Sequence, residues 1–334
     1  MKASQLWFIE PGKVEIREHE LSSLTQDEVL IKTKVSAISA GTEMLIYRGQ
    51  IPQSLPLDTS IKAFEGLDGM YPMPYGYACV GIIEEAGSSV DKNLKGKKVF
   101  AFQPHASHFI CEIDQLIMLP DEMSEEAGTF LANMETAVNF LIDGEAQKHE
   151  SVAILGMGVV GQLVNALLDK QPLRKLVAVD GIWFRREIAA KRKNTLVLLP
   201  DSKELLEING GFNLIFELSG NPEALNLAIE LCAFSGRIIV GSWYGDKSVP
   251  INLGGAFHRN RLKIISSQVS TISPEHAAKW TKDKRLQKAL NSIAELKVEE
   301  FITHHFPLSD ADKAYSLIDK ETGKSLQVIL TYED

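Results

Sequence analysis

The chain has 334 residues and a formal net charge of −9, and 45% of its residues are hydrophobic and 24% charged. This composition is ordinary for a globular protein, and the length is enough for two domains with separate cores. The acidic balance, without any basic run, argues against nucleic acid or a membrane surface as partner. No stretch approaches the ~20 apolar residues of a membrane span and the amino terminus shows no secretory pattern, so we expect a cytoplasmic protein.

Residues 1 to about 120 have the pattern of a small β-barrel, with several short strands separated by turns. Pro11-Gly12 predicts a hairpin turn between the first two strands, and Val29 to Val35 alternate as in a half-buried strand. We expect strands at residues 6–9, 14–17, 29–35, 79–86, 98–102, 108–112 and 116–119. The segment 50–74, rich in proline and glycine, is predicted to be a long loop, and loops of that length usually carry function.

Beyond this region, helical and strand patterns alternate, which predicts a parallel, doubly wound sheet. Ser124 is the expected N-cap of a helix that continues to Leu141, and Ser273-Pro274-Glu275 predicts the start of another helix. The tail from Glu299 again has a strand pattern and is expected to return to the first domain. Between the two helices, strands are expected near residues 152–155, 176–179, 195–199, 213–218, 237–241 and 262–267, and further helices near 185–193, 203–208 and 222–233. We therefore expect an α/β protein with a β-barrel domain of residues 1–122, completed by 297–334, and a nucleotide-binding domain of residues 123–296.

Residues 151–180 carry the most specific pattern in the chain. An apolar strand is followed by Gly156-Met157-Gly158-Val159-Val160-Gly161, then by a helical pattern and a second strand that ends in Asp180. The acid follows the last glycine by 19 residues (180 − 161). This is the dinucleotide-binding fingerprint in its proper context: the glycines allow a tight turn, close approach of a pyrophosphate and helix packing.

Asp180 also bears on which dinucleotide binds. A carboxylate at this place accepts hydrogen bonds from the ribose hydroxyls of NAD, whereas the 2′-phosphate of NADP would meet like charge, at a cost of about 1–4 kcal/mol per pair at ~4 Å. Arg185 and Arg186 follow and would soften that preference, although a solvated helix start is the plainer interpretation. We expect NAD, with NADP less favoured. Further cofactor-side candidates are the loops after two later strands, with Ser219, Gly220, Gly241 and Ser242.

Nearly the whole chain resembles the medium-chain dehydrogenase/reductase superfamily of zinc alcohol dehydrogenases and their zinc-free relatives. Residues 39–49, SAGTEMLIYRG, are similar to the family's CGTDxxIYRG, residues 75–83, YGYACVGII, to its GHExxGxV, and residues 96–100, GKKVF, to its GDRV. The resemblance implies a GroES-like barrel domain followed by a Rossmann domain. Residues 36–43 also resemble bacteriochlorophyllide dehydrogenases, and residues 254–261, GGAFHRNR, resemble threonine-dehydrogenase-like proteins. Neither similarity identifies a substrate.

The positions that hold zinc or its close neighbours in the family are changed in this chain. They carry Ala40, Tyr77 and Ala78, and alanine has no donor atom while a neutral tyrosine is a poor zinc ligand. The four-cysteine lobe of the family is also missing, and the three cysteines of the chain lie far apart. We expect no bound metal. His105 and His108 are the remaining candidates for metal ligands, and hydrogen-bonding histidines are the favoured interpretation of both.

Without zinc, a hydrogen-bond donor or general acid has to polarise the substrate oxygen. The resemblance places Thr42 at the start of the family's proton relay and Tyr77 where the metal-binding histidine stands, and Glu135 is a third candidate. Three classes of function remain open: a zinc-independent NAD(H)-dependent dehydrogenase acting on a small molecule, an NADPH-preferring quinone or enone reductase, and a non-catalytic nucleotide-binding protein. As in the family, we expect a homodimer formed through the edge of the cofactor sheet, where residues 262–267 would lie.

Overall fold

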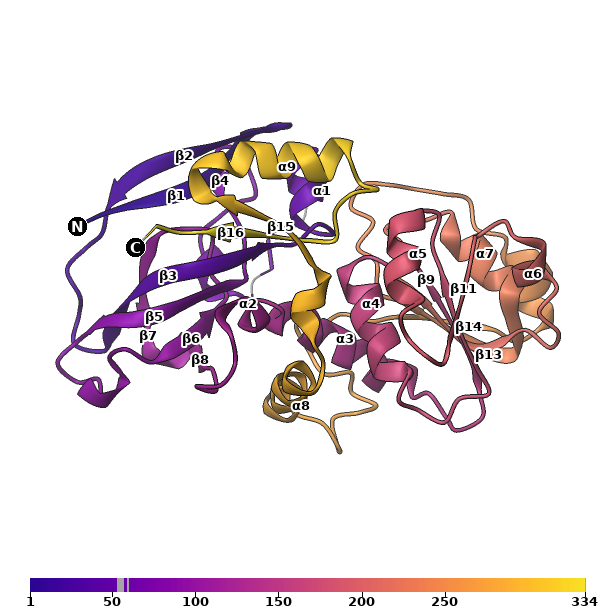
Figure 1. The fold of residues 1–334 in the computed structure, drawn as a ribbon. Helices are drawn as coiled ribbons and strands as arrows, with labels where there is room; N and C mark the ends of the chain where they lie inside the picture. The colour runs from indigo at the N-terminus through magenta and orange to yellow at the C-terminus, as the bar shows by residue number, and fades with distance from the viewer. Residues whose placement is uncertain (53–56, 59, 334) are drawn as a thin grey trace. The chain divides into compact units, whose positions relative to one another are not determined.

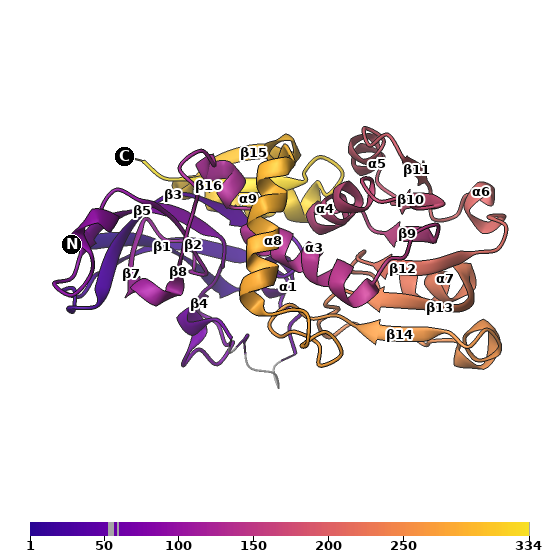
Figure 2. The same cartoon turned by 90° about the horizontal axis from the view of Figure 1, so that it is seen from below.

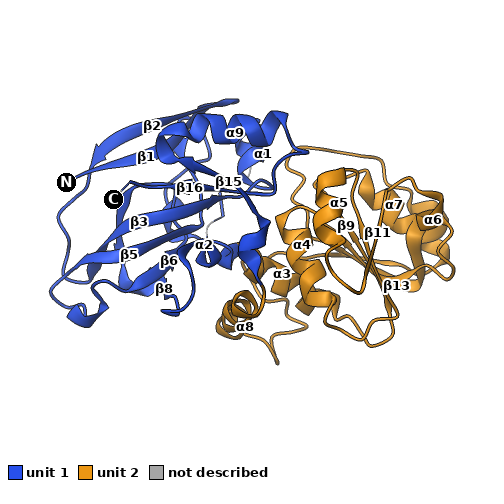
Figure 3. Ribbon diagram, viewed as in Figure 1, with its two compact units in different colours: residues 1–132, 297–334 blue, residues 133–296 orange. Residues whose placement is uncertain are grey.

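The computed structural model describes residues 1–52, 57, 58 and 60–333. The chain forms two compact units, residues 1–132 with 297–334 and residues 133–296, drawn in blue and orange in Figure 3. Among the described residues, no helix has the length and apolar character needed to cross a membrane.

The described residues of the first unit form two β-sheets (Figure 1). β1 (Lys2–Glu10) and β2 (Lys13–Glu20) form an antiparallel hairpin, and the short β4 (Met73–Pro74) pairs with β1. The larger sheet has the order β15-β16-β3-β5-β6-β8, and β7 pairs with β3. Its strands are β3 (Glu28–Ile38), β5 (Cys79–Ala86), β6 (Lys98–Ala101), β7 (His108–Glu112), β8 (Leu116–Met118), β15 (Ile302–Pro307) and β16 (Gln327–Thr331). The hairpin and the strands expected from the sequence for the head of the chain are present.

The segment predicted as a long loop is partly packed into the core of this unit. Residues 53–56 and 59, Pro56 among them, lie outside the described residues, but Leu57, Phe64 and Met73 are buried in one hydrophobic cluster. A short 3-10 helix, η1 (Lys62–Phe64), brings Phe64 inward, where its ring stacks on Tyr75 at 4.6 Å between centroids. Apolar side chains therefore anchor the described part of this segment.

The carboxyl-terminal tail joins the larger sheet of the first unit. β16 pairs antiparallel with β3 and parallel with β15. Between these two strands lies α9 (Ala311–Lys320), a helix that the sequence-based expectation of a β-like tail missed. Its signal was present, since Ala311, Ala314, Tyr315 and Ile318 recur at helical spacing and are all buried.

The second unit contains a parallel sheet of six strands in the order β11-β10-β9-β12-β13-β14, which Figure 2 shows from top to bottom. These are β9 (Ser151–Leu155), β10 (Lys175–Val179), β11 (Thr195–Leu198), β12 (Phe212–Glu217), β13 (Cys232–Val240) and β14 (Lys263–Ser266). Numbered along the chain, this is the order 3-2-1-4-5-6 of dinucleotide-binding folds. The strand order reverses between β9 and β12, so the crevice for a ligand is expected at their carboxyl ends.

Helices connect these strands as the sequence predicts, with two corrections. They are α4 (Val159–Leu168), α5 (Trp183–Ala189), α6 (Lys203–Leu206) and α7 (Ala224–Leu231). The helix expected after Ser124 is divided into α2 (Glu125–Gly128) and α3 (Leu131–Gly144), and Ser124 caps α2 as predicted. The last helix of the unit, α8 (Lys282–Glu295), begins after Thr281 and not at Ser273. Residues 273–284 bury no side chain, and a helix with no apolar face to bury is only marginally stable.

Candidate cofactor site and hydroxyl pair

The glycine turn between β9 and α4 has one crowded side and one open position. Gly156 has φ +99°, and a Cβ there would lie 2.5 Å from the Cα of Ser219, so only glycine fits. A Cβ on Gly161 would lie 2.0 Å from the carbonyl oxygen of Gly156, which shows how closely the helix packs on the turn. A Cβ on Gly158 would meet nothing within 4 Å. The turn thus leaves open space where the fingerprint places a pyrophosphate, before the amino terminus of α4.

Asp180 ties the end of β10 to this turn. One carboxylate oxygen accepts a hydrogen bond from the backbone N–H of Met157 at 2.7 Å, and the other accepts one from Ile182 at 2.7 Å. A carboxylate oxygen has about two lone-pair sites, so each keeps capacity for one further donor. Two hydroxyls of a ribose are donors of the required kind. The residues present therefore fit an adenosine ribose.

Two arginines lie beside this carboxylate, and they are not a solvated helix start. Arg186 donates from Nη1 to the main-chain oxygen of Asp180 at 2.8 Å. Nη1 of Arg185 lies 3.8 Å from Oδ2 of Asp180, and the buried Nε of Arg185 has no hydrogen-bond partner. Arg185 is thus a cation at the edge of the candidate ribose site with a donor still free.

The loops that follow β12 and β13 are joined by a buried carboxylate that the sequence analysis did not single out. Glu217 accepts hydrogen bonds from the backbone N–H of Ser219 at 2.8 Å and from the Tyr244 phenol. The N–H of Gly220 in turn donates to Oγ of Ser242 at 2.9 Å. Burial, followed by the Glu217 charge, raises the pKa of Tyr244. In the sequence, Glu217 is visible only as a lone acid at the end of the apolar strand FNLIFE. Its carboxylate links Ser219 after β12 to Tyr244 after β13.

Gly241 closes β13, and it too is required by close approach. A Cβ there would lie 2.3 Å from Cζ of Phe140. Val159 and Val160, at the start of α4, are partly exposed next to Gly158. The cofactor-side candidates of the sequence analysis consequently lie in the segments that follow the carboxyl ends of β9, β10, β12 and β13, either on the loops or in the first turns of α4 and α5.

In the first unit, the structure brings Thr42 and Tyr77 together. Thr42 immediately precedes α1 (Glu43–Tyr47), yet its side chain makes no cap hydrogen bond to that helix, and its hydroxyl is instead close enough to the Tyr77 phenol to lower the pKa of that phenol. Tyr77 is half-buried and donates to Oγ of Ser39. Burial raises the pKa of Tyr77 to about 12, against the opposing effect of the Ser39 and Thr42 hydroxyls. The phenol is therefore a hydrogen-bond donor at neutral pH.

The donor set in this region does not fit a catalytic zinc. Ala40 and Ala78 offer no ligand atom, and the Tyr77 phenol stays protonated at neutral pH, which makes it a poor zinc ligand. Within the part of the chain that the structure describes, three or more histidine, cysteine, aspartate or glutamate side chains nowhere gather as a metal site would need. The two candidate histidines take different partners: His105 bonds Glu43 and Ser36, and His108 lies 3.7 Å from Glu84.

Glu135, the third candidate for proton chemistry, lies on α3 and faces a cation. Its Oε1 accepts hydrogen bonds from Nε and Nη2 of Arg285 at 3.1 and 3.0 Å. The Arg285 side chain is only 2% exposed, and its Nη1 also donates to Asn139 at 2.6 Å. Glu135 is thus part of a buried ion pair within the second unit.

Comparison with known proteins agrees with this architecture along the whole chain, although no family model matches it. The chain is 24% identical to a zinc-type alcohol dehydrogenase-like protein of Escherichia coli, with 97% of this chain and 98% of the relative aligned. It is 26% identical to L-threonine 3-dehydrogenase of Caldanaerobacter subterraneus, over 95% of this chain and 94% of that protein. Along nearly its whole length, the chain is thus similar to zinc-type alcohol dehydrogenase-like proteins and dehydrogenases related to them.

Solved structures of several dehydrogenases share the fold. One is an alcohol dehydrogenase of Escherichia coli in complex with NADH, with a TM-score of 0.80, 18% identity and 99% coverage of both chains. Another is 2R,3R-butanediol dehydrogenase of Bacillus subtilis, with a TM-score of 0.80, 17% identity and coverage of 98% of this chain and 99% of that chain. A third, a dehydrogenase of Sinorhizobium meliloti with a TM-score of 0.79 and 16% identity, is bound to NADP and covers 99% of each chain. The fold expected from the sequence, a GroES-like barrel domain with a Rossmann domain, is confirmed.

Proposed function

We propose that this protein is an NAD(H)-dependent oxidoreductase that interconverts an alcohol and a carbonyl compound without a catalytic zinc ion. The observation that carries the proposal is the Asp180 carboxylate at the glycine turn, with one free acceptor site on each oxygen. Superfamily relatives with complexes of NADH or NADP support a nicotinamide cofactor in general. Asp180 favours NAD, because its charge repels a 2′-phosphate. Arg185 opposes this preference in part.

The bound cofactor supplies the hydride chemistry, so the chain has to bind it, orient it and manage one proton. The cofactor is bound by the glycine turn, by Asp180 and by the two loops that carry Ser219 and Ser242. Tyr77 donates the proton to the substrate oxygen, because a protonated phenol can form a hydrogen bond to an oxygen that gains negative charge during carbonyl reduction. Thr42 supports it by donating to the phenol oxygen as that oxygen gives up its proton. Glu135 is left out of the proton chemistry because Arg285 already binds its carboxylate.

Cofactor titration followed by a substrate panel tests this assignment. We expect calorimetry to show tighter binding of NADH than of NADPH, and NADH oxidation with at least one carbonyl compound from a panel of ketoses, 2-keto acids, diketones and aldehydes. Tighter NADPH binding together with turnover of quinones or enones would favour the reductase alternative. Cofactor binding without turnover of any compound would favour the non-catalytic alternative.

The metal-free part of the proposal rests on the missing donor atoms at residues 40 and 78. Dialysis against a chelator is therefore expected to leave activity unchanged. Stoichiometric zinc in elemental analysis, with activity lost on chelation and restored by zinc, would contradict it. His105, His108 and Glu135 would then be the candidate zinc ligands.

We further propose a homodimer. β14 is the last strand of the six-stranded sheet, it pairs only with β13 among the described strands, and Ile264 on it is 38% exposed. An unpaired edge strand is a template for pairing that proteins usually cover. Light scattering is expected to give twice the 37.0 kDa of the chain, and a monomer mass would refute the dimer.

A further inference from the structure

Glu43, the residue after Thr42, carries a fully buried carboxylate on which three donors converge. Its Oε1 accepts a hydrogen bond from the backbone N–H of Ser39 at 2.8 Å. Its Oε2 accepts one from the Tyr315 phenol and lies 3.0 Å from Nε2 of His105. An ionised carboxylate only accepts hydrogen bonds, and this environment satisfies it without any cationic lysine or arginine.

His105 is fully buried as well, and its partners define how its ring is protonated. With Glu43 as acceptor, Nε2 carries the proton. Nδ1 lies 2.7 Å from Oγ of Ser36, and this Oγ lies 2.7 Å from the Tyr332 phenol. The consistent direction is that Tyr332 donates to Ser36, Ser36 donates to Nδ1, and Nε2 donates to Glu43. This direction pairs every polar atom of the series Tyr332–Ser36–His105–Glu43.

The ring of His105 also packs on the segment that carries Tyr77. Gly76 has φ +124°, and a Cβ there would lie 2.6 Å from Cδ2 of the imidazole. Any side chain at this position would displace the ring. Through Oε1 of Glu43 on one side and the ring of His105 on the other, the pair therefore contacts both the 39–42 turn and the backbone next to Tyr77.

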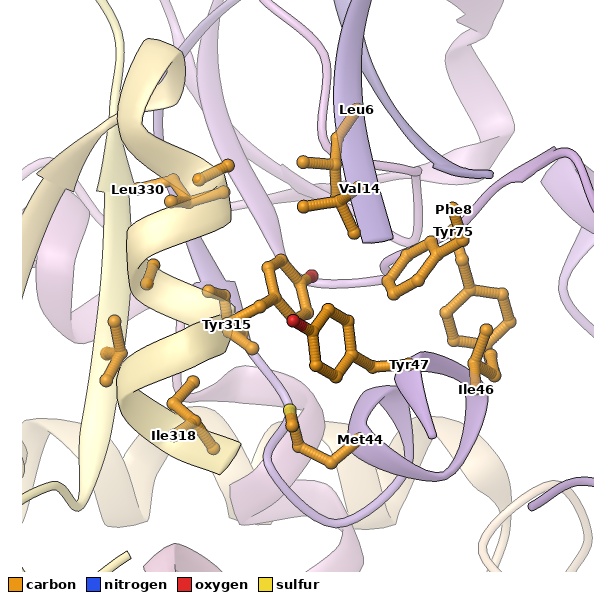
Figure 4. Close-up of a cluster of buried hydrophobic side chains, with 14 of the residues drawn as sticks. Leu6, Phe8, Val14, Met44, Ile46, Tyr47, Tyr75, Tyr315, Ile318 and Leu330 are labelled. Carbon is orange, nitrogen blue, oxygen red and sulfur yellow. The ribbon is translucent and has the colours of Figure 1, made fainter. Parts of the chain in front are cut away.

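Tyr315 brings the carboxyl-terminal helix α9 into this arrangement. Figure 4 shows its ring next to Tyr47 of α1 in the hydrophobic core of the first unit. The two rings are stacked with centroids 5.5 Å apart, and Phe8 meets Tyr315 edge-on at 5.3 Å. The core fixes the phenol, so Glu43 receives a rigid donor.

We propose that Glu43 is a positioning residue for the Thr42–Tyr77 pair, held in place by His105 and by Tyr315 from the carboxyl-terminal segment. The role in turnover rests on the proposed function, but the placement of Tyr77 does not. Ser39 accepts a hydrogen bond from the phenol through Oγ, the Thr42 hydroxyl lowers the pKa of the phenol, and Glu43 holds the turn that carries Ser39 and Thr42.

The buried charge has an electrostatic consequence that a merely structural side chain would lack. After burial, which is the largest effect, the negative charges of Glu43 and Asp58 raise the pKa of Tyr77. The other titratable groups around Tyr77 are the Tyr75 and Tyr315 phenols. Neutralising Glu43 removes a charge that disfavours the phenolate. Glu43→Gln should therefore lower the pKa of Tyr77.

The test uses the full chain with tyrosines labelled at Cζ with carbon-13, and Tyr77→Phe assigns the Tyr77 signal. In Glu43→Gln, we expect the Tyr77 titration midpoint to shift to lower pH in the absence of any substrate. If a substrate has been found, we expect kcat to fall by about 10²-fold with little change in the Kd of NADH, as when reacting groups are misplaced by ~1 Å. An unchanged Tyr77 titration in the folded variant overturns the proposal. Lack of turnover in the unaltered protein contradicts the proposed function alone, because the titration needs no substrate.

Two matched pairs cover the case in which Glu43→Gln does not fold. Tyr315→Phe removes one donor to Glu43, and Tyr71→Phe removes a phenol of the same unit that donates to the carbonyl of Ile46 instead. We expect only Tyr315→Phe to alter the Tyr77 signal. His105→Gln can still donate to Glu43 and should retain more of the native signal than His105→Leu. Equal effects within either pair would contradict the positioning role.

Discussion

Glu43 and Glu135 are buried carboxylates in different units, and their partners differ in kind. Glu135 is bonded twice by the Arg285 guanidinium, which is always charged, so the pair is neutral as a whole. Glu43 is bonded by a backbone N–H, a phenol and an imidazole, and no lysine or arginine is among its hydrogen-bond partners. The comparison teaches that burial alone does not mark a carboxylate as functional. A carboxylate whose charge is balanced contributes to stability, whereas one left unbalanced acts on its neighbours, in this case Tyr77.

The largest effect is expected from breaking the balanced pair. Arg285→Met leaves the Glu135 carboxylate buried without its cation, and loss of one partner of a buried ion pair typically costs about 3–5 kcal/mol. Urea unfolding should show a fall of this size in the free energy of unfolding. The double variant Arg285→Met/Glu135→Leu should recover much of it, because an apolar pair avoids the uncompensated charge. If the single and double variants were equally unstable, charge balance would not explain the pair.

Breaking the hydroxyl pair should instead affect turnover. Tyr77→Phe removes the donor to the developing alkoxide, and one such donor is worth about 3–4 kcal/mol, or about 10²–10³ in kcat. The Kd of NADH should hardly change, since the cofactor-side residues belong to the second unit. Thr42→Val should act in the same direction, and the double variant should fall short of additivity because the two hydroxyls act together. Full activity of Tyr77→Phe would remove this residue from the mechanism.

Two substitutions of Asp180 separate the effect of its negative charge from the effect of its hydrogen bonds to the backbone of the glycine turn. Asp180→Asn removes the negative charge and keeps one oxygen acceptor for Met157 or Ile182, whereas Asp180→Ala removes both functions. We expect both variants to narrow the preference for NADH over NADPH by about 1 kcal/mol or more, the value of one screened charge pair. Only Asp180→Ala should also weaken binding of NADH strongly. Isothermal titration calorimetry measures both affinities, and an unchanged preference in both variants would show that Arg185 and not Asp180 sets it.

The smallest effect is expected in the pH dependence of stability and of carbonyl reduction. Since the folded pKa of Tyr77 is about 12 and the ordinary pKa of a tyrosine is 10.0, the native state holds this proton more tightly than the unfolded chain. The resulting stability is fully present below pH 10 and is lost as pH rises through about 12. Carbonyl reduction should likewise keep its Tyr77-dependent rate through neutral pH. In Glu43→Gln, the alkaline loss should begin at lower pH. No such change is expected in Glu135→Gln, which makes that variant the control.

The pattern of the sequence predicted most strands of the first unit and the alternation of the second, because each rests on local periodicity. It placed the start of α8 eight residues too early (281 − 273), since Ser273-Pro274-Glu275 is a good local start for a segment that has nothing to bury. It also missed α9, whose apolar spacing was overlooked within a tail interpreted as β-like. These errors arise where packing, and not propensity, selects the element.

By itself, the sequence determined the dinucleotide fingerprint, because glycine turn, strand, helix and acid are adjacent in the chain and their spacing specifies their geometry. It also showed that ligand atoms for zinc are missing at two family positions. Only the tertiary structure decided which buried acids matter. Glu43 meets His105 and Tyr315 at separations of 62 and 272 positions, and Glu135 meets Arg285 at a separation of 150. No local pattern encodes such partners, since a buried carboxylate takes its role from the charges that the fold brings to it.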